Sequence, residues 1–247
     1  SRLIVAGPVS GSEVVAAAGE HLGEWSGNGP GHRTFEPGAA GGRRIVLVDR
    51  PGSVQSELRV GQLGIDRRSP RYFPAMVLGA MLGGVFGSRL NLRLREELGY
   101  TYGARAGFDP RRAVGPFSAA AAVQTEVTAD AVREMVDILT RVREAAPEES
   151  ELREIRDFLV GVFPLRFETT SGVAMAIEPL AVYGLPDEWW QTYRSHLEGV
   201  SADDVHAAAR ELLDPDRYLI LVVGDAGTVR AELESTALGP LEVAAGD

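Results

Sequence analysis

A glycine- and proline-rich stretch, residues 26–42, divides the chain near its N-terminus. Its sequence, SGNGPGHRTFEPGAAGG, interrupts all hydrophobic periodicity, as expected of a linker between packed units. We place the linker at residues 28–42, between a short unit at residues 1–27 and a larger domain at residues 43–247. In the short unit an apolar strand, Leu3 to Ala6, is expected to precede a helix that begins at an N-cap, Ser12.

The larger domain is expected to carry strands in its first third and near its end, with a long helical region between them. The strands are predicted at residues 44–49, 54–65, 101–108, 116–124 and 218–223. Helices are predicted at residues 72–82 and 88–98, with further starts at Thr128, Glu148, Ser171, Pro186, Ser201 and Thr228. Along the second strand Val54, Ser56, Leu58, Val60 and Gln62 alternate with polar residues or glycine, which predicts one buried face.

Composition excludes several classes of protein. With 35 acidic and 25 basic residues among 247, the formal charge is −10, and such a surface repels nucleic acid. Cysteine is absent, so disulfides, thiolate metal sites and cysteine nucleophiles are excluded. We see neither an apolar run near the roughly 20 residues of a membrane span nor a signal peptide. We therefore expect a cytoplasmic protein without a membrane span.

A search for catalytic groups finds no convincing set. The histidines His21, His32, His196 and His206 are scattered, and none is spaced from another as in a helical zinc pair. The sequence also has no G-x-S-x-G nucleophile elbow. We predict no catalytic residue and no metal ligand in this chain, and we interpret the glycines of residues 82–87 (LGGVFG) as a hinge or tight turn between two helices.

Two side chains near the end of the helix at 88–98 are the remaining candidates. Gly99 is a natural residue to follow a helix C-terminus, which places Tyr100 just past the helix end, seven positions after Arg93. One interpretation is structural: Arg93 pairs with Glu96 or Glu97, and Tyr100 packs at a strand start. The other is that both side chains hold a peptide, and the two residues alone leave the choice open.

The surrounding motif resembles a known family. Gly83-Gly84, Ser88-Arg89-Leu90, Leu92-Arg93 and Leu98-Gly99-Tyr100 together are similar to the signature of the zinc-free second half of the pitrilysin-type metallopeptidases, which include the mitochondrial processing peptidase. Residues 1–27 resemble the strand and helix that end the first half of such a protein. In agreement, RLIVAG at residues 2–7 is similar to RYLILVVG at residues 217–224.

The resemblance implies an α+β fold, in which a mixed, mainly antiparallel sheet carries helices on one face. It implies a non-catalytic half that binds a peptide or unfolded protein through Arg93 and Tyr100. The zinc, on an H-x-x-E-H motif that this sequence lacks, is expected in a homologous half or partner subunit, where cleavage takes place. The alternative is a purely structural or assembly subunit of a processing-peptidase-like complex.

Overall fold

A six-stranded mixed sheet forms the centre of the larger domain. The computed structural model describes residues 2–27, 29, 38 and 41–245. The strands are β1 (Arg44–Asp49), β2 (Gln55–Leu63), β3 (Ala104–Phe108), β4 (Pro116–Gln124), β5 (Leu219–Gly224) and β6 (Leu241–Ala245), in the spatial order β3-β4-β2-β5-β1-β6. The pairs β3/β4, β4/β2 and β2/β5 are antiparallel, while β5/β1 and β1/β6 are parallel. The predicted sheet, mixed but mainly antiparallel, is confirmed.

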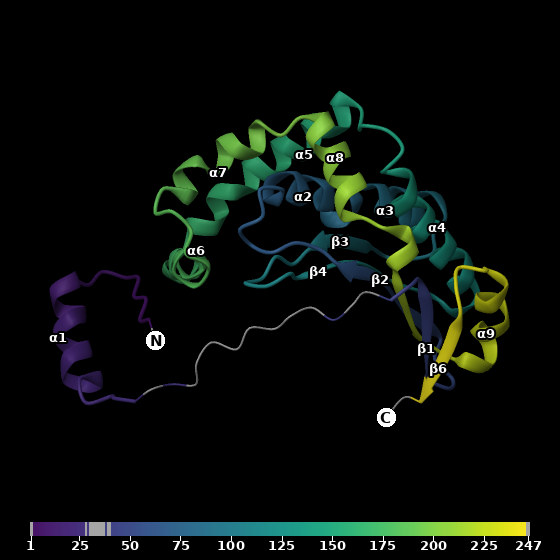
Figure 1. The fold of residues 1–247 in the computed structure, drawn as a ribbon, viewed down its shortest axis with the longest axis horizontal. Coiled ribbons are helices and arrows are strands. Elements are labelled where there is room, and N and C mark those ends of the chain that lie inside the picture. Colours follow the sequence, from purple (N-terminus) through teal and green to yellow (C-terminus); the bar gives the residue numbers. More distant parts are fainter. Residues whose placement is uncertain (1, 28, 30–37, 39–40, 246–247) are drawn as a thin grey trace.

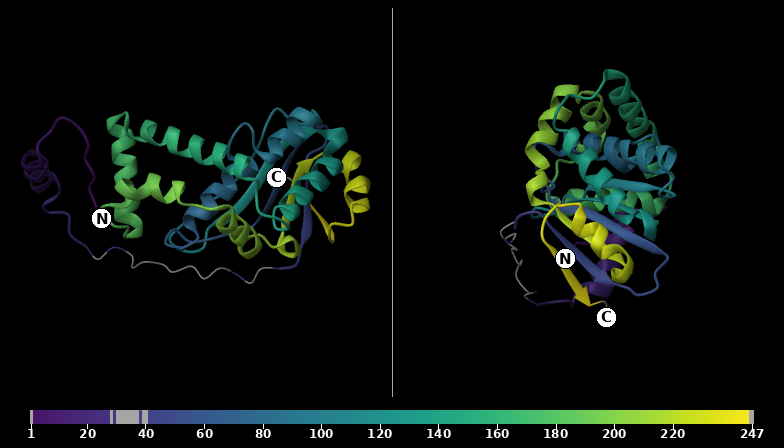
Figure 2. Two further views of the ribbon diagram at one scale, coloured as in Figure 1. Left: turned by 90° about the horizontal axis from the view of Figure 1, so that it is seen from above. Right: turned by 90° about the vertical axis from the view of Figure 1, so that its right-hand side faces the viewer.

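Helices of the larger domain cover one face of this sheet, as predicted (Figures 1 and 2). They are α2 (Tyr72–Gly79), α3 (Arg89–Asn91), α4 (Thr128–Arg141), α5 (Glu149–Val162), α6 (Thr170–Tyr183), α7 (Trp189–Glu198), α8 (Ala202–Leu212) and α9 (Ala226–Ser235). Two π-helical turns, η1 (Ala80–Gly84) and η2 (Leu92–Glu97), continue α2 and α3. Short 3₁₀ turns lie at η3 (Thr125–Val127), η4 (Phe163–Phe167) and η5 (Pro215–Arg217).

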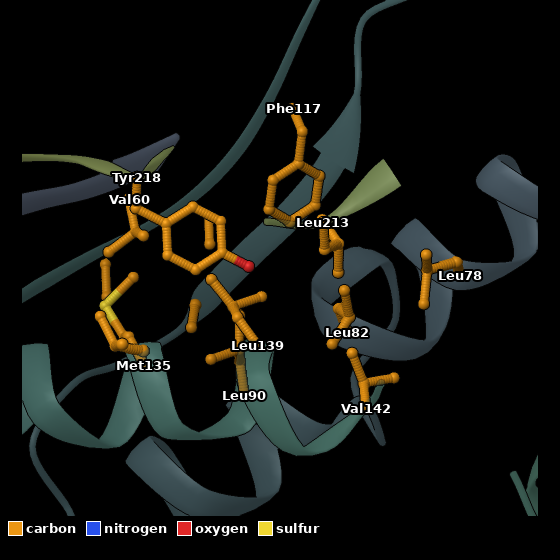
Figure 3. Close-up of a cluster of buried hydrophobic side chains, with 14 of the residues drawn as sticks. Val60, Leu78, Leu82, Leu90, Phe117, Met135, Leu139, Val142, Leu213 and Tyr218 are labelled. Atoms are coloured by element: carbon orange, nitrogen blue, oxygen red, sulfur yellow. The ribbon is translucent and has the colours of Figure 1, made fainter. Parts of the chain in front are cut away.

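The core lies between the sheet and its helices. Along β2, Ser56, Leu58 and Val60 are fully buried toward the helices, while the residues between them are exposed. Figure 3 shows the side chain of Tyr218 among apolar residues from both layers. The alternation predicted for β2 is confirmed, except that Val54 precedes the strand and is 82% exposed.

The N-terminal unit differs from its prediction. Residues 2–6 form no strand, and Leu3 is 60% exposed, because a single extended segment has no neighbouring strand with which to form hydrogen bonds here. The N-cap of the helix α1 (Gly11–Leu22) is Ser10 rather than Ser12, since Ser10 forms a capping box with Glu13. None of the α1 residues is buried, and the helix lies apart from the sheet in Figure 1.

Other predictions need smaller corrections. The helix predicted from Pro186 begins at Trp189, because a turn from Pro186 to Trp189 precedes it. The strand predicted from Thr101 begins at Ala104, since the Thr101 hydroxyl donates a hydrogen bond to the Gly103 carbonyl and the chain bends there. The strand β6 was not predicted at all. By contrast, the capping box of Ser201 with Asp204 confirms the predicted start of α8.

One stretch of the domain is as long and apolar as a membrane span. It runs from Tyr72 to Glu97, and 56% of its most apolar window is buried inside the fold. The extended backbone of Val85 (φ −133°, ψ 164°) interrupts its helical course. Packing in the protein core therefore accounts for its hydrophobic residues.

Candidate functional site

The segment that carries Arg93 and Tyr100 is fixed to the sheet by a buried asparagine. Asn91, only 7% exposed, donates through Nδ2 to the carbonyl of Ala104 at 2.9 Å, and its Oδ1 accepts from the Ala104 amide at 2.8 Å. The same Nδ2 lies 3.1 Å from the Ser88 hydroxyl and 3.2 Å from the Val85 carbonyl. One amide side chain thus joins the turn before α3, the helix and the start of β3.

Glycines let the preceding helix approach the same strand closely. A Cβ atom on Gly83 would overlap the backbone nitrogen of Ala106, and one on Gly79 would lie 3.0 Å from the Cα of Gly107. Gly83 is therefore required for contact between η1 and β3. The turn predicted within residues 82–87 is confirmed at residues 85–88, between η1 and α3, while Gly83 lies just before it as a packing position inside η1.

Arg93 is held by two carboxylates. Its Nε and Nη2 donate to both oxygens of Glu134 on α4 at 2.8 Å, and its Nη1 donates to Glu97 at 2.8 Å. These hydrogen bonds raise the pKa of Arg93, and the bonds from Arg93 hold the pKa of Glu134 below its ordinary value. The predicted pairing with Glu97 is confirmed, while the stronger, bidentate pairing with Glu134 was missed.

The guanidinium of Arg93 keeps part of its donor capacity. A guanidinium has five N–H groups, of which these contacts use three, and the Arg93 side chain is 40% exposed. With one cation between two anions, the local charge is −1. Such an arrangement favours a neutral carbonyl oxygen over a carboxylate as an additional partner of Arg93.

Tyr100 follows a left-handed residue at the end of η2. Gly99 has φ +64°, and the Tyr100 amide donates to the Leu94 carbonyl at 2.8 Å, which reverses the chain toward β3. The ring is half-buried against the core. Its hydroxyl makes no hydrogen bond to any residue that the structure describes, so it is available to a ligand. Neighbouring Tyr102, in contrast, is 93% exposed.

A hollow of about 340 Å³ lies beside the start of β3. Gly103, Ala104 and Arg105 line it, together with Glu57 of β2 and residues 120–122 of β4. The outer edge of β3 at Ala104 is occupied by Asn91, so an extended peptide cannot form strand hydrogen bonds with that residue. In the described sheet, the other edge strand is β6.

The donor set of the domain does not fit zinc. Over residues 2–27 and 41–245, no group of three or more His, Cys, Asp or Glu side chains is placed to hold a metal ion. His196 stacks on Phe73, and His206 contacts the Arg143 carbonyl, so neither approaches another histidine as a zinc ligand would. No step of metal chemistry is assigned to residues of this chain.

Comparison with protein families decides where the chain belongs. Residues 1–159 match the family model described as peptidase M16 inactive domain. The chain belongs to this family. Among curated proteins none matches the chain. The resemblance to the pitrilysin-type peptidases drawn from the motif around Arg93 is thereby confirmed.

Solved structures show the same fold. The M16 inactive domain from Pseudomonas fluorescens is 27% identical, with a TM-score of 0.79 over 88% of this chain and 52% of that one. A protease from Helicobacter pylori is 17% identical, with a TM-score of 0.77, over 88% of this chain and 54% of that one. A chain of complex III from Candida albicans is 13% identical, with a TM-score of 0.63, over 76% and 49%. The chain spans about half the length of these proteins.

Proposed function

We propose that this chain is the non-catalytic, substrate-binding half of an M16 peptidase. It positions a peptide or an unfolded protein for cleavage at a zinc site in another half or subunit. The observation that carries the proposal is the arrangement of the Arg93–Tyr100 segment. At the end of a helix that Asn91 holds to the sheet lie a partly exposed guanidinium with spare donors and a phenol that has no hydrogen-bond partner among the described residues.

Each side chain has a distinct role in this proposal. Arg93 donates to a peptide carbonyl of the substrate, held in orientation by Glu134 and Glu97. Tyr100 donates to the oxygen on which negative charge develops when the carbonyl is attacked, where a fixed donor is most effective. Water activation and bond cleavage belong to the zinc-bearing half.

The N-terminal unit supports an origin in a longer polypeptide. Residues 1–27 are proposed as the strand and helix that complete a preceding homologous half, and residues 28–42 as its linker to the domain at 43–247. Several apolar side chains of this unit are exposed, among them Val9 at 53%, Val15 at 72% and Trp25 at 72%. A preceding half would bury them.

The second candidate is a structural or assembly subunit. It is favoured by the saturation of three Arg93 donors within the fold and by the likeness to a chain of complex III. A purely structural subunit has no use for the free hydroxyl of Tyr100. The two candidates differ in what removal of the Arg93 charge does to turnover.

Reconstitution tests the proposal. Peptide cleavage is measured for the chain alone and after addition of the zinc-bearing half or subunit encoded with it. We expect turnover only in the mixture, and an increase of about tenfold or more in KM for Arg93→Gln, because a charged hydrogen bond contributes about 1.5–3 kcal/mol. Arg95→Gln is the matched control, since Arg95 pairs with its neighbour Glu96 on the same helix.

Three outcomes would refute the proposal. The first is cleavage with stoichiometric zinc by the chain alone. The second is an equal loss of turnover in both arginine variants. The third is unchanged turnover in both variants, which would favour the structural candidate.

A further inference from the structure

Away from the Arg93–Tyr100 segment, four arginines surround one pocket. The arginine pocket, of about 400 Å³, is lined by Arg2, Arg67, Arg68 and Arg112 and by the C-terminal end of α6 at residues 181–184. In a chain with a formal charge of −10, such a concentration of positive charge is unexpected from composition.

Arg67 is buried in this pocket without an anionic partner. The residue is only 6% exposed, and its Nη1 is buried without a hydrogen bond to any described residue. Burial lowers the pKa of Arg67, although an arginine side chain stays charged in proteins. A buried cation without hydrogen-bond partners is costly, which makes the site favourable for an anion.

Two aromatic rings contact the Arg67 guanidinium, while its Nη1 makes no hydrogen bond to any described residue. Its Cζ lies 3.9 Å from the ring centroid of Tyr72 and 4.6 Å from that of Trp189. Both rings attract the cation electrostatically, but neither ring supplies an oxygen acceptor to the N–H donors of the guanidinium. The rings therefore fix the orientation of the group without replacing an anion.

The backbone also fixes the arginines relative to one another. The Arg67 amide donates to the Arg111 carbonyl at 2.8 Å, and Asp66 and Arg111 form a β-bridge, which joins the loop of Arg67 and Arg68 to the turn of Arg112. The backbone positions that carry these arginines are therefore fixed relative to one another before any ligand arrives, which lowers the entropic cost of binding.

Neighbouring carboxylates are already engaged elsewhere. Asp66 accepts from the backbone amide of Arg68, Asp109 pairs with Arg111, and Glu211 pairs with Arg71. The carbonyl of Val182, at the end of α6, accepts from Arg112 at 2.9 Å. Among the described residues that line the pocket there is no aspartate or glutamate, so an anionic ligand meets no negative side chain from this part of the chain.

We propose that the arginine pocket binds a small, multiply charged oxyanion of the phosphate class, held by the in-plane donors of Arg67 and by Arg68. Planar guanidinium forks match the oxygens of such a group and bind it in bidentate fashion. This role is independent of the proposed action of Arg93 and Tyr100, and either can fail without the other.

Titration of the full chain with inorganic phosphate tests the proposal, by calorimetry or NMR at constant ionic strength. We expect saturable 1:1 binding and a loss of about tenfold in affinity for Arg68→Gln, since one charged hydrogen bond contributes about 1.5–3 kcal/mol. Arg67→Lys keeps the charge but loses the fork, and a similar loss is expected. Should that variant not fold, the exposed Arg68 still decides the question.

Arg111→Gln is the matched control, because Arg111 is adjacent to Arg112 but its side chain pairs with Asp109 outside the pocket. The affinity of the R111Q variant for phosphate should stay within about twofold of that of the original chain, because the substitution removes only an exposed ion pair. Acetate, a single negative charge, should bind at least about tenfold more weakly than phosphate. Absence of saturable phosphate binding, equal losses in R68Q and R111Q, or equal affinities for acetate and phosphate would each overturn the proposal.

Discussion

Replacement of Asn91 by alanine should be among the most damaging single changes near the Arg93–Tyr100 segment. The side chain accepts from the Ala104 amide and donates to the Ala104 carbonyl, and both contacts are buried. Alanine would leave both backbone groups without a partner, at about 1–3 kcal/mol each. Together the two groups give a range of about 2–6 kcal/mol. We expect a loss of about 3 kcal/mol in the free energy of unfolding, toward the lower end of this range, because the smaller side chain lets water approach.

Urea unfolding measures this cost directly. The variant N91A should lose about 3 kcal/mol, which for a chain of this size corresponds to about 6–12 °C in Tm. The control E96A changes an exposed residue on the same helical segment and should stay within about 0.5 kcal/mol. Hydrogen exchange at the Ala104 amide should be slow in the original chain and fast in N91A.

A loss of less than about 1 kcal/mol together with continued protection of the Ala104 amide would contradict this role of Asn91. In that case the helix and β3 would be held together without the amide side chain. Packing at the glycine contacts of η1 would then be the main interaction between them.

Three further substitutions test other parts of the structure. Tyr218→Phe should leave stability unchanged or raise it by about 1 kcal/mol in urea unfolding, because the buried hydroxyl has no partner among the described residues; a clear loss would contradict this. Gly83→Ala should cost about 3 kcal/mol or prevent folding, since its Cβ would overlap the facing strand, whereas Gly87→Ala, with open space around it, should be neutral. Glu134→Gln should destabilise the chain at neutral pH. The Arg93 contact lowers the pKa of Glu134, so the difference should persist above the ordinary glutamate pKa of about 4.3 and vanish as pH falls through the lowered value; a difference independent of pH would refute it.

Several predictions that rest on local physics agree with the structure, although the N-cap of α1 at Ser10 was missed. The alternation along β2 and the cap at Ser201 depend on residues a few positions apart, and both are confirmed. The pairing of Arg93 with Glu97 is of the same kind, at i and i+4. In each case the interacting groups are brought together by a single element of secondary structure.

Features that depend on distant residues could not be predicted from one sequence. Leu3 to Ala6 has the composition of a strand but no neighbouring strand, so its β-propensity is not realised. Glu134 reaches Arg93 across 41 positions, and only the packing of α4 against η2 brings them together. An asparagine at position 91, among apolar helix residues, is a visible sign in the sequence of a buried amide. Its partner, Ala104, carries no such sign.

The arginine pocket shows the same limit. Arg67, Arg68 and Arg112 are unremarkable in sequence, since arginines are usually solvated side chains. The bridge between Asp66 and Arg111 makes them neighbours, and the rings of Tyr72 and Trp189 bury one of them. Only the assembled fold shows a cation without a counter-charge.

The most direct test of the account concerns the hydroxyl of Tyr100 in the reconstituted peptidase. We predict that Tyr100→Phe lowers kcat for peptide cleavage about a hundredfold with intact folding, because a donor to the developing oxyanion acts mainly in the transition state. Tyr102→Phe, which alters a phenol two residues away that is 93% exposed, should leave kcat unchanged. Equal kcat values for both variants and the original protein would contradict the proposed role of Tyr100 as a donor to the developing oxyanion.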